Sequence, residues 1–178
     1  MTTVPLADDR LRLEPLRVDH AGELVDVLSD TGLYAFTGGS PPSRTALEQR
    51  YARQVAGSGD PAQAWHNWVV RLGADGPAVG YVQATVAPAD RWVELAWVVG
   101  AAWQGRGIAR EAAALVLGHL AARGDVTRVV AHVHPDHDAS QRVAAALGMR
   151  PTDRVAGGEV EWELVVGSAA GSAAKRLS

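Results

Sequence analysis

The 178-residue sequence contains no cysteine, one phenylalanine and two methionines. Without cysteine the chain has no disulfide framework, no thiol nucleophile and no thiolate ligands for zinc or an iron–sulfur cluster. No apolar run approaches the roughly 20 residues that a membrane-spanning helix needs, and no apolar stretch of a secretion signal follows Met1. These absences predict a cytoplasmic protein that does not bind a membrane.

A basic excess is also missing, because 17 Lys and Arg residues stand against 20 Asp and Glu residues, for a formal net charge of -3. Binding to nucleic-acid phosphates requires such an excess, so a dedicated nucleic-acid binder is not expected. The hydrophobic share of 47% predicts one globular domain, which we place at residues 1–166. Residues 167–178 are small and polar, and they are predicted to be disordered.

Hydrophobic periodicity predicts a mixed α+β fold, with a central sheet of six to seven mostly antiparallel strands flanked by about four helices. The second helix is expected to begin at a capping-box pattern formed by Thr45 and Glu48. In chain order we expect a strand at 11–16, a helix at 21–28, a loop at 29–43, a helix from 45, three strands between 64 and 99, a helix at 108–120, a strand at 127–133, a helix at 140–147 and a final hairpin turning at 157–158. Three alternating glutamates of that hairpin, Glu159, Glu161 and Glu163, indicate a solvated face.

A glycine-containing loop, residues 104–107, lies where a predicted strand ends and a helix begins. Backbone N–H groups exposed there can converge on a phosphate at the positive end of the helix dipole. The spacing is neither a dinucleotide-binding fingerprint, which needs glycine or alanine in place of Arg110, nor a Walker loop, which needs Gly-Lys-Ser/Thr. On spacing alone, an ordinary loop with two glycines explains the pattern equally well.

The pattern Gln-x-x-Gly-x-Ala at Gln104, Gly107 and Ala109 resembles the pyrophosphate-binding motif of the GNAT superfamily of acyl-CoA N-acyltransferases. The preceding segment 94–99 and the later segment 134–149 are similar to the strand and the strand–helix unit that surround this motif in the family. The likeness covers roughly residues 11–166 and lies nearest the branch of the ribosomal-protein N-terminal acetyltransferases. It implies the GNAT fold, with acetyl-CoA as co-substrate and no metal.

The resemblance also implies which residues hold acetyl-CoA. Main-chain groups of Trp97, Val98 and Val99 would pair with the pantetheine as an added strand does. Many members carry Asn-x-x-Ser in the later unit; Ser140 matches the serine, whereas His137 stands in place of the asparagine. The pyrophosphate would lie on the loop formed by Gln104, Gly105, Arg106, Gly107, Ile108 and Ala109.

Two side chains are candidates for proton transfer. Glu94 is a lone carboxylate on an apolar strand, and members of this branch often keep a glutamate there as general base. A structural glutamate that pairs with an arginine or a backbone group is the alternative. Between Gly148 and Val166 there is no tyrosine to act as the acid that many members use, so Ser140 is the candidate acid. The implied reaction is direct attack of a primary amine, of a small molecule or a protein N-terminus, on acetyl-CoA in a ternary complex.

Two other functions compete with this interpretation. The string His132-x-His134-x-Asp136-His137 has the pattern of the dinuclear metallo-β-lactamase-type hydrolases, but no further histidine follows it to complete such a site. A non-catalytic acyl-CoA-binding or regulatory module on the same fold would keep the phosphate loop and lose the base. The sequence identifies neither the amine acceptor nor the oligomeric state, and a homodimer stays open.

Overall fold

The computed structural model describes residues 3–166, which form a mixed α+β fold around one sheet of eight strands. The strand order is β1-β2-β3-β4-β5-β6-β8-β7, and all neighbours are antiparallel except β5 and β6, which are parallel. The mostly antiparallel sheet is confirmed. It has more strands than the expected six to seven, partly because the two-residue strand β1 (Leu6–Ala7) is too short to show a period. The segment predicted to be disordered, 167–178, lies outside the described residues, and the single domain at 1–166 stays a prediction.

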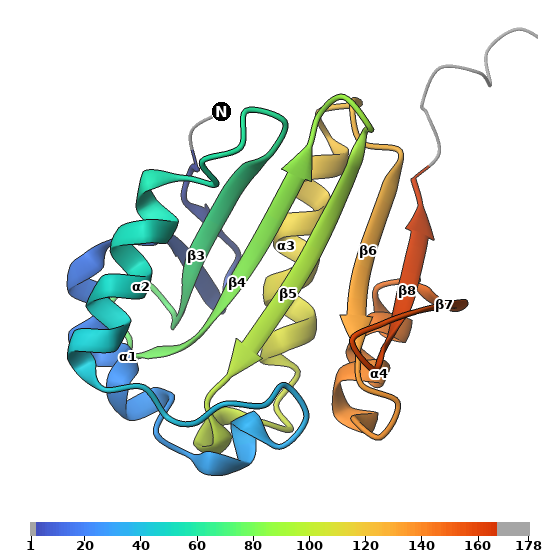
Figure 1. The fold of residues 1–178 in the computed structure, drawn as a ribbon. Coiled ribbons are helices and arrows are strands. Elements are labelled where there is room, and N and C mark those ends of the chain that lie inside the picture. Colours follow the sequence, from blue (N-terminus) through green and yellow to red (C-terminus); the bar gives the residue numbers. More distant parts are fainter. Residues whose placement is uncertain (1–2, 167–178) are drawn as a thin grey trace, which may run out of the picture.

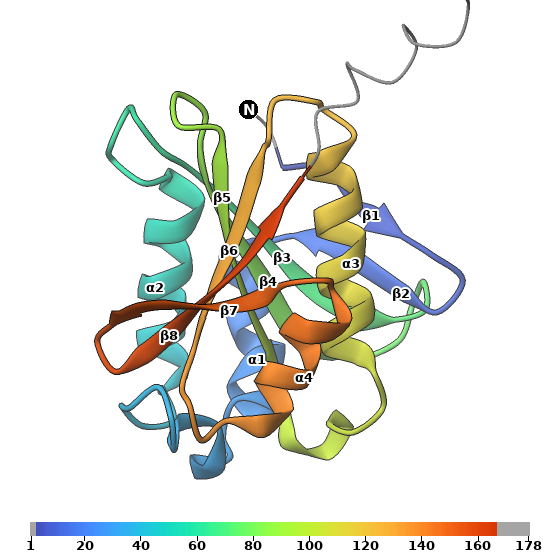
Figure 2. The ribbon, with the colours of Figure 1, turned by 90° about the vertical axis from the view of Figure 1, so that its right-hand side faces the viewer.

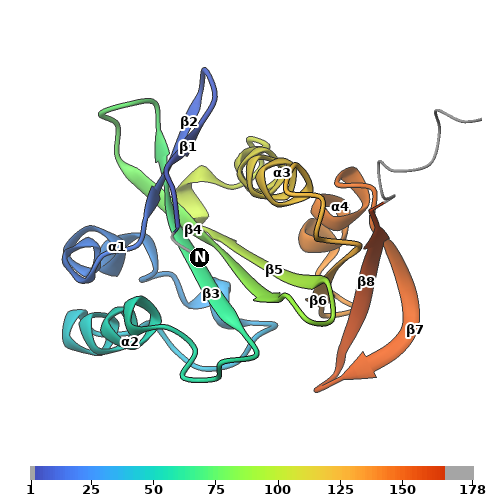
Figure 3. The ribbon, with the colours of Figure 1, turned by 90° about the horizontal axis from the view of Figure 1, so that it is seen from above.

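The helices pack on both faces of this sheet (Figure 3). On one side lie α1 (Ala21–Val27) and α2 (Arg44–Ala56), and on the other lie α3 (Ile108–Ala121) and α4 (Asp138–Ala146). No helix within residues 3–166 is long and apolar enough to cross a membrane. The remaining strands are β2 (Leu11–Pro15), β3 (Ala64–Leu72), β4 (Ala78–Ala87), β5 (Trp92–Val99), β6 (Arg128–Val133), β7 (Arg150–Ala156) and β8 (Glu159–Val165), and the short 3₁₀ helices are η1 (Val18–His20), η2 (Thr31–Tyr34) and η3 (Ala101–Trp103).

The period of two in the strands sorts side chains into two hydrophobic cores, one on each face. Leu95 of β5 is buried with Val116 of α3 in the larger core, and Leu24 of α1 is buried with Leu47 of α2 in the smaller one. Burial of such a side chain stabilises the fold by about 1.5–3 kcal/mol. Each helical layer is therefore packed on the sheet by its own hydrophobic core, one on each side of the strands that carry the candidate site.

The parallel strands β5 and β6 stay together for only part of their length. Their register runs from Trp92↔Arg128 to Glu94↔Val130. Beyond Glu94, β5 remains paired with β4 as far as Val99, while β6 remains paired with β8 as far as Val133. Because each strand follows the twist of its own antiparallel partner, the two diverge toward their carboxyl ends (Figure 1). The hairpin β7–β8 borders β6 on the far edge of the sheet (Figure 2).

Two helix starts differ from the sequence-based expectation. The capping box at Thr45 and Glu48 is wrong, because α2 begins at Arg44 and Ser43 is its N-cap, accepting the amide hydrogen of Ala46 over 3.2 Å. Glu48 instead pairs with Arg44 at 3.0 Å. Helix α4 begins at Asp138, two residues before the expected start. The expected loop 29–43 also contains η2, at whose start the Asp30 carboxylate accepts from an amide.

Candidate active site

The loop before α3 presents an open helix N-terminus. Gly105 and Gly107 have φ angles of +74° and +76°, in the left-handed region that favours glycine, and Gly107 is the N-cap of the 14-residue helix α3. No side chain caps this end, and a Cβ built at either glycine would meet no atom within 4 Å. The first-turn amides and the helix dipole therefore face open space, which is the arrangement that binds an anion.

The side chains around this loop hold it in place. The Gln104 amide donates to the Val99 carbonyl over 3.0 Å, and the Arg106 guanidinium donates to the Ala102 carbonyl over 3.0 Å. Arg10 donates to the Arg106 carbonyl over 2.8 Å and pairs with Glu111 of α3 at 3.1 Å. Gln104 thus ties the loop to the end of β5, which leaves the backbone amides as the main candidate donors to a phosphate.

The end of β5 offers main-chain groups to the gap between β5 and β6. The Gly100 amide donates to the Val79 carbonyl of the β4 side over 2.9 Å. Main-chain direction alternates along an antiparallel ladder, so Val98 also faces β4, whereas Trp97 and Val99 face the gap. Of the three residues expected to contact pantetheine, Trp97 and Val99 are therefore the two whose N–H groups point toward a ligand in the gap.

Ser140 lies at the other side of the gap. It belongs to the first turn of α4, and its Oγ accepts a hydrogen bond from the Trp97 indole N–H over 3.2 Å. Trp97 packs against the core beneath α3, so this contact is on the α3/α4 face. Ser140 is thereby brought next to the stretch of β5 whose amides face the gap.

Glu94 is on the opposite face of β5, and its partner is a histidine rather than an arginine or a backbone group. The Oε1 atom of Glu94 lies 2.8 Å from Nδ1 of His132, which β6 carries 38 positions further along the chain. The two side chains are 38% and 26% exposed, respectively, so both reach solvent. Sequence reasoning missed this pair, because no local pattern links His132 to Glu94.

The three histidines of the metal-like string have three different partners. His132 contacts Glu94, and Nδ1 of His134 accepts the Asp136 amide over 3.1 Å. The His137 ring stacks on Phe36 with 4.5 Å between ring centroids. Among residues 3–166, no group of three or more acidic, histidine or cysteine side chains is placed to hold a metal ion.

Phe36, the only phenylalanine, connects the loop 29–43 to the turn after β6. Its ring lies 5.3 Å from that of His134 as well as stacking on His137. Burial lowers the pKa of His137, and the neighbouring His134 lowers it further. The position that the resemblance assigns to a pantetheine contact is thus a half-buried imidazole stacked on an aromatic ring. No local sequence pattern indicates this contact.

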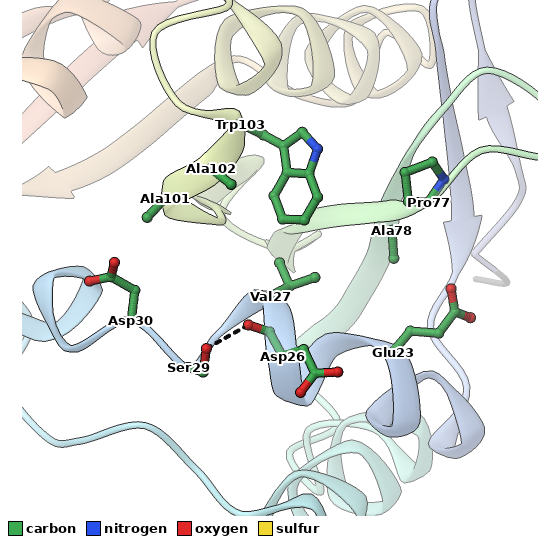
Figure 4. Close-up of a pocket in the computed structure, with 10 residues that line it drawn as sticks. All are labelled: Glu23, Asp26, Val27, Ser29, Asp30, Pro77, Ala78, Ala101, Ala102 and Trp103. Carbon is green, nitrogen blue, oxygen red and sulfur yellow. Dashed lines mark hydrogen bonds between the residues drawn. The ribbon is translucent and has the colours of Figure 1, made fainter.

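A surface hollow of about 400 Å³ lies between α1, η3 and the connection from β3 to β4. Figure 4 shows the Trp103 indole over Val27, with the carboxylates of Glu23, Asp26 and Asp30 around it. Carboxylates repel phosphates, and none of the expected site residues lines this hollow. The hollow is therefore separate from the gap between β5 and β6.

Comparisons with known proteins bear on the family and the fold of the chain. The family model of the acetyltransferase (GNAT) domain matches residues 10–150. A search of curated proteins finds no match. Among solved structures, an acetyltransferase of the GNAT family from Bacillus anthracis is 18% identical with a TM-score of 0.74, covering 91% of this chain and 98% of that one.

Two further structures contain a bound coenzyme. RimL, a ribosomal L7/L12 alpha-N-protein acetyltransferase in complex with coenzyme A, is 14% identical with a TM-score of 0.74, covering 92% of this chain and 98% of that one. The microcin self-immunity acetyltransferase MccE, in complex with acetyl-CoA and AMP, has the same identity of 14% and TM-score of 0.74, covering 89% of this chain and 94% of its own. At such identities these structures show the fold, while the family model covers most of the chain. The chain therefore belongs to the GNAT acetyltransferase family.

Proposed function

We propose that this protein is an acetyl-CoA-dependent N-acetyltransferase that acetylates a primary amine by direct attack in a ternary complex. The observation that carries the proposal is the meeting of four features at one gap in the sheet. These are the open N-terminus of α3, the main chain of β5 facing the gap, the hydroxyl of Ser140 and the carboxylate of Glu94. An anion site, a surface for an extended amide-bearing ligand and two proton-transfer groups are what transfer from a CoA thioester requires.

Acetyl-CoA fits the chain's residues as a co-substrate. Its pyrophosphate would accept hydrogen bonds from the amides of residues 105–109, where no side chain caps α3. The pantetheine would then run along β5, exchanging hydrogen bonds with the main chain at Trp97 and Val99. This path directs the thioester to the divergence of β5 from β6, with Ser140 on one face and Glu94 on the other.

The transfer itself needs a base, an oxyanion donor and an acid. Glu94, directly or through another group, would remove a proton from the substrate ammonium. The free amine attacks the thioester carbon while the Trp97 N–H, which the ligand reaches after Val99 on its path along β5, stabilises the developing oxyanion. The new N–C bond forms, the C–S bond breaks, and Ser140 delivers a proton to the thiolate. Holding both reactants in one gap contributes to the rate by removing their translational freedom.

The acceptor is the amine of a small molecule or of a protein N-terminus. RimL is described as a ribosomal L7/L12 alpha-N-protein acetyltransferase, so a protein N-terminus has a precedent as the acceptor on this fold. The loop 29–43, whose Phe36 contacts the turn after β6, would shape the acceptor pocket together with the final hairpin.

An acceptor screen tests the proposal. Purified protein is mixed with acetyl-CoA and a panel of amines that contains polyamines, amino acids, aminoglycosides and peptides with free N-termini. Free thiol is then followed over time, and the acetylated product is identified by mass. We expect amine-dependent thiol release with at least one acceptor. Tight CoA binding without transfer to any amine would instead support the non-catalytic acyl-CoA-binding module.

A further inference from the structure

We propose that the atom which takes the ammonium proton is Nε2 of His132, and that Glu94 is the positioning residue that holds this imidazole through Nδ1. This division of roles rests on the proposed acetyl transfer and makes it more specific. It uses a histidine that the motif of the family does not include and that the metal-like string would make a metal ligand rather than a base.

Hydrogen-bond chemistry determines which nitrogen is free. At neutral pH a carboxylate only accepts hydrogen bonds, so the 2.8 Å contact with Oε1 of Glu94 requires that Nδ1 of His132 carry the hydrogen. In a neutral imidazole the other nitrogen, Nε2, is then an acceptor with a free lone pair. The contact thus selects the tautomer that exposes a base.

Strand register places His132 nearer than Glu94 to the reacting atoms. Glu94 pairs with Val130, so His132 is level with Ala96, two residues further toward the open end of the gap. Two residues correspond to about 6–7 Å along a strand. The Trp97 and Val99 amides, where the thioester is proposed to lie, are at that end. An amine that attacks there meets His132 before it can reach Glu94.

Apart from Glu94, the charged side chains near His132 form ion pairs with one another. Glu161 of β8 lies directly opposite His132 and is bonded to Arg128 of β6 at 2.7 Å and to Arg154 of β7. Burial by itself would raise the pKa of Glu161, but the two arginines bring it below its ordinary value. Glu163 shares both arginines, so the glutamates expected to form a solvated face are largely ion-paired.

The other neighbours do not compete as bases. Thr85 of β4 stands opposite Glu94 and carries a neutral hydroxyl. His134, next along β6 on the same face, accepts a hydrogen bond from the Asp136 amide through Nδ1 and lies against Phe36. Of the groups that face this part of the gap, the Glu94–His132 pair is the one with a nitrogen lone pair held by a carboxylate.

The proposed step conserves protons and bonds. An ammonium N–H bond breaks, and its proton moves to Nε2 of His132, giving an imidazolium that Glu94 stabilises as an ion pair. The amine then forms the N–C bond as the C–S bond breaks. The second nitrogen proton goes to the departing sulfur by way of Ser140, and the imidazolium returns its proton to water. The net change is an amide, CoA thiol and one released proton.

Matched substitutions separate the two roles. Asn at position 132 keeps a donor at the place of Nδ1 and lacks Nε2, whereas Gln at position 94 keeps the shape of Glu94 without its charge. The set comprises His132→Asn, Glu94→Gln, the double variant and, as a control, His119→Asn on α3, away from the gap. Turnover is measured with the acceptor found in the screen, acetyl-CoA affinity by calorimetry, and the tautomer of His132 by ¹⁵N NMR of the imidazole.

We expect kcat to fall about 10²–10⁴-fold in both single variants. The kcat of His119→Asn should equal that of the wild type, and the acetyl-CoA affinity of every variant should stay unchanged. The kcat of the double variant should be no lower than that of the less active single variant, because the pair acts as a unit. Added imidazole should partly restore His132→Asn and leave Glu94→Gln unrestored. NMR should show Nδ1–H in the wild type.

Retention of wild-type kcat by His132→Asn, together with a loss in Glu94→Gln, would overturn the proposal and make Glu94 the direct base. So would an Nε2–H tautomer of His132 in the wild type. Absence of transfer by the wild-type protein to any amine would contradict the proposed function instead, and the tautomer measurement would still test the Glu94–His132 contact.

Discussion

A single charge at Gly107 tests the anion site. Gly107 is the N-cap of α3 with φ of +76°, and a side chain there would enter space in which no atom lies within 4 Å of its Cβ. Asp and Asn have the same shape and both tolerate the left-handed region better than most residues. Comparing Gly107→Asp with Gly107→Asn therefore isolates the effect of the charge from the effects of backbone strain and bulk.

The charge should act in opposite directions on stability and on binding. A carboxylate at the positive end of α3 stabilises the ligand-free helix by about 0.3–1 kcal/mol. The same carboxylate at about 5 Å from a phosphate charge costs about 1–3 kcal/mol, for an effective dielectric constant between that of water and that of a protein surface. CoA affinity should thus be about 5-fold to 150-fold weaker for Asp than for Asn.

Calorimetric titration with CoA at low and high salt measures this difference, and thermal melts measure stability. The difference in affinity should shrink as salt screens the charge, and it should vanish for pantetheine, which has no pyrophosphate. If folded Asp and Asn variants bind CoA equally at low salt, the pyrophosphate does not lie at the N-terminus of α3.

Three further outcomes are expected. The protein should purify without stoichiometric zinc or iron, and its activity should survive chelation; elemental analysis that finds a metal lost together with activity would favour the hydrolase. His132→Asn should abolish the acidic limb of the pH–rate profile, whereas a purely structural His132 would lower only the melting temperature. Burial lowers the pKa of His66 from 6.5 to about 4. The unfolded chain therefore takes up a proton before the folded one, and stability should fall by up to about 3 kcal/mol as the pH drops through this range. Denaturant unfolding at several pH values should show a weaker dependence for His66→Gln; an equal dependence would refute this.

Local features of the site could be predicted from the sequence, because their chemistry lies within a few residues. The proposed phosphate loop needs only glycines at a strand–helix junction, and Gly105 and Gly107 do have the left-handed conformation. The alternation of Val93 and Leu95 follows from burial of one face of β5. Selecting Ser43 over Thr45 as the helix cap was harder, since both residues can cap a helix and they stand two positions apart.

Contacts between distant strands were not predictable. The Glu94–His132 hydrogen bond depends on β5 and β6 being parallel neighbours with a particular register, which no local pattern specifies. Likewise, the alternating glutamates of β8 carry no sign of Arg128 and Arg154, which adjacent strands bring to them. Only the three-dimensional arrangement distinguishes an ion-paired glutamate from a solvated one.

The most direct test of the whole account is a crystal structure of the protein with bound CoA. We predict the pyrophosphate on the amides of residues 105–109, the pantetheine beside the main chain of Trp97 and Val99, and the sulfur at the divergence of β5 from β6 next to Ser140. The face that carries Glu94 and His132 should remain open to an amine. CoA bound elsewhere, with the gap between β5 and β6 empty, would contradict the account.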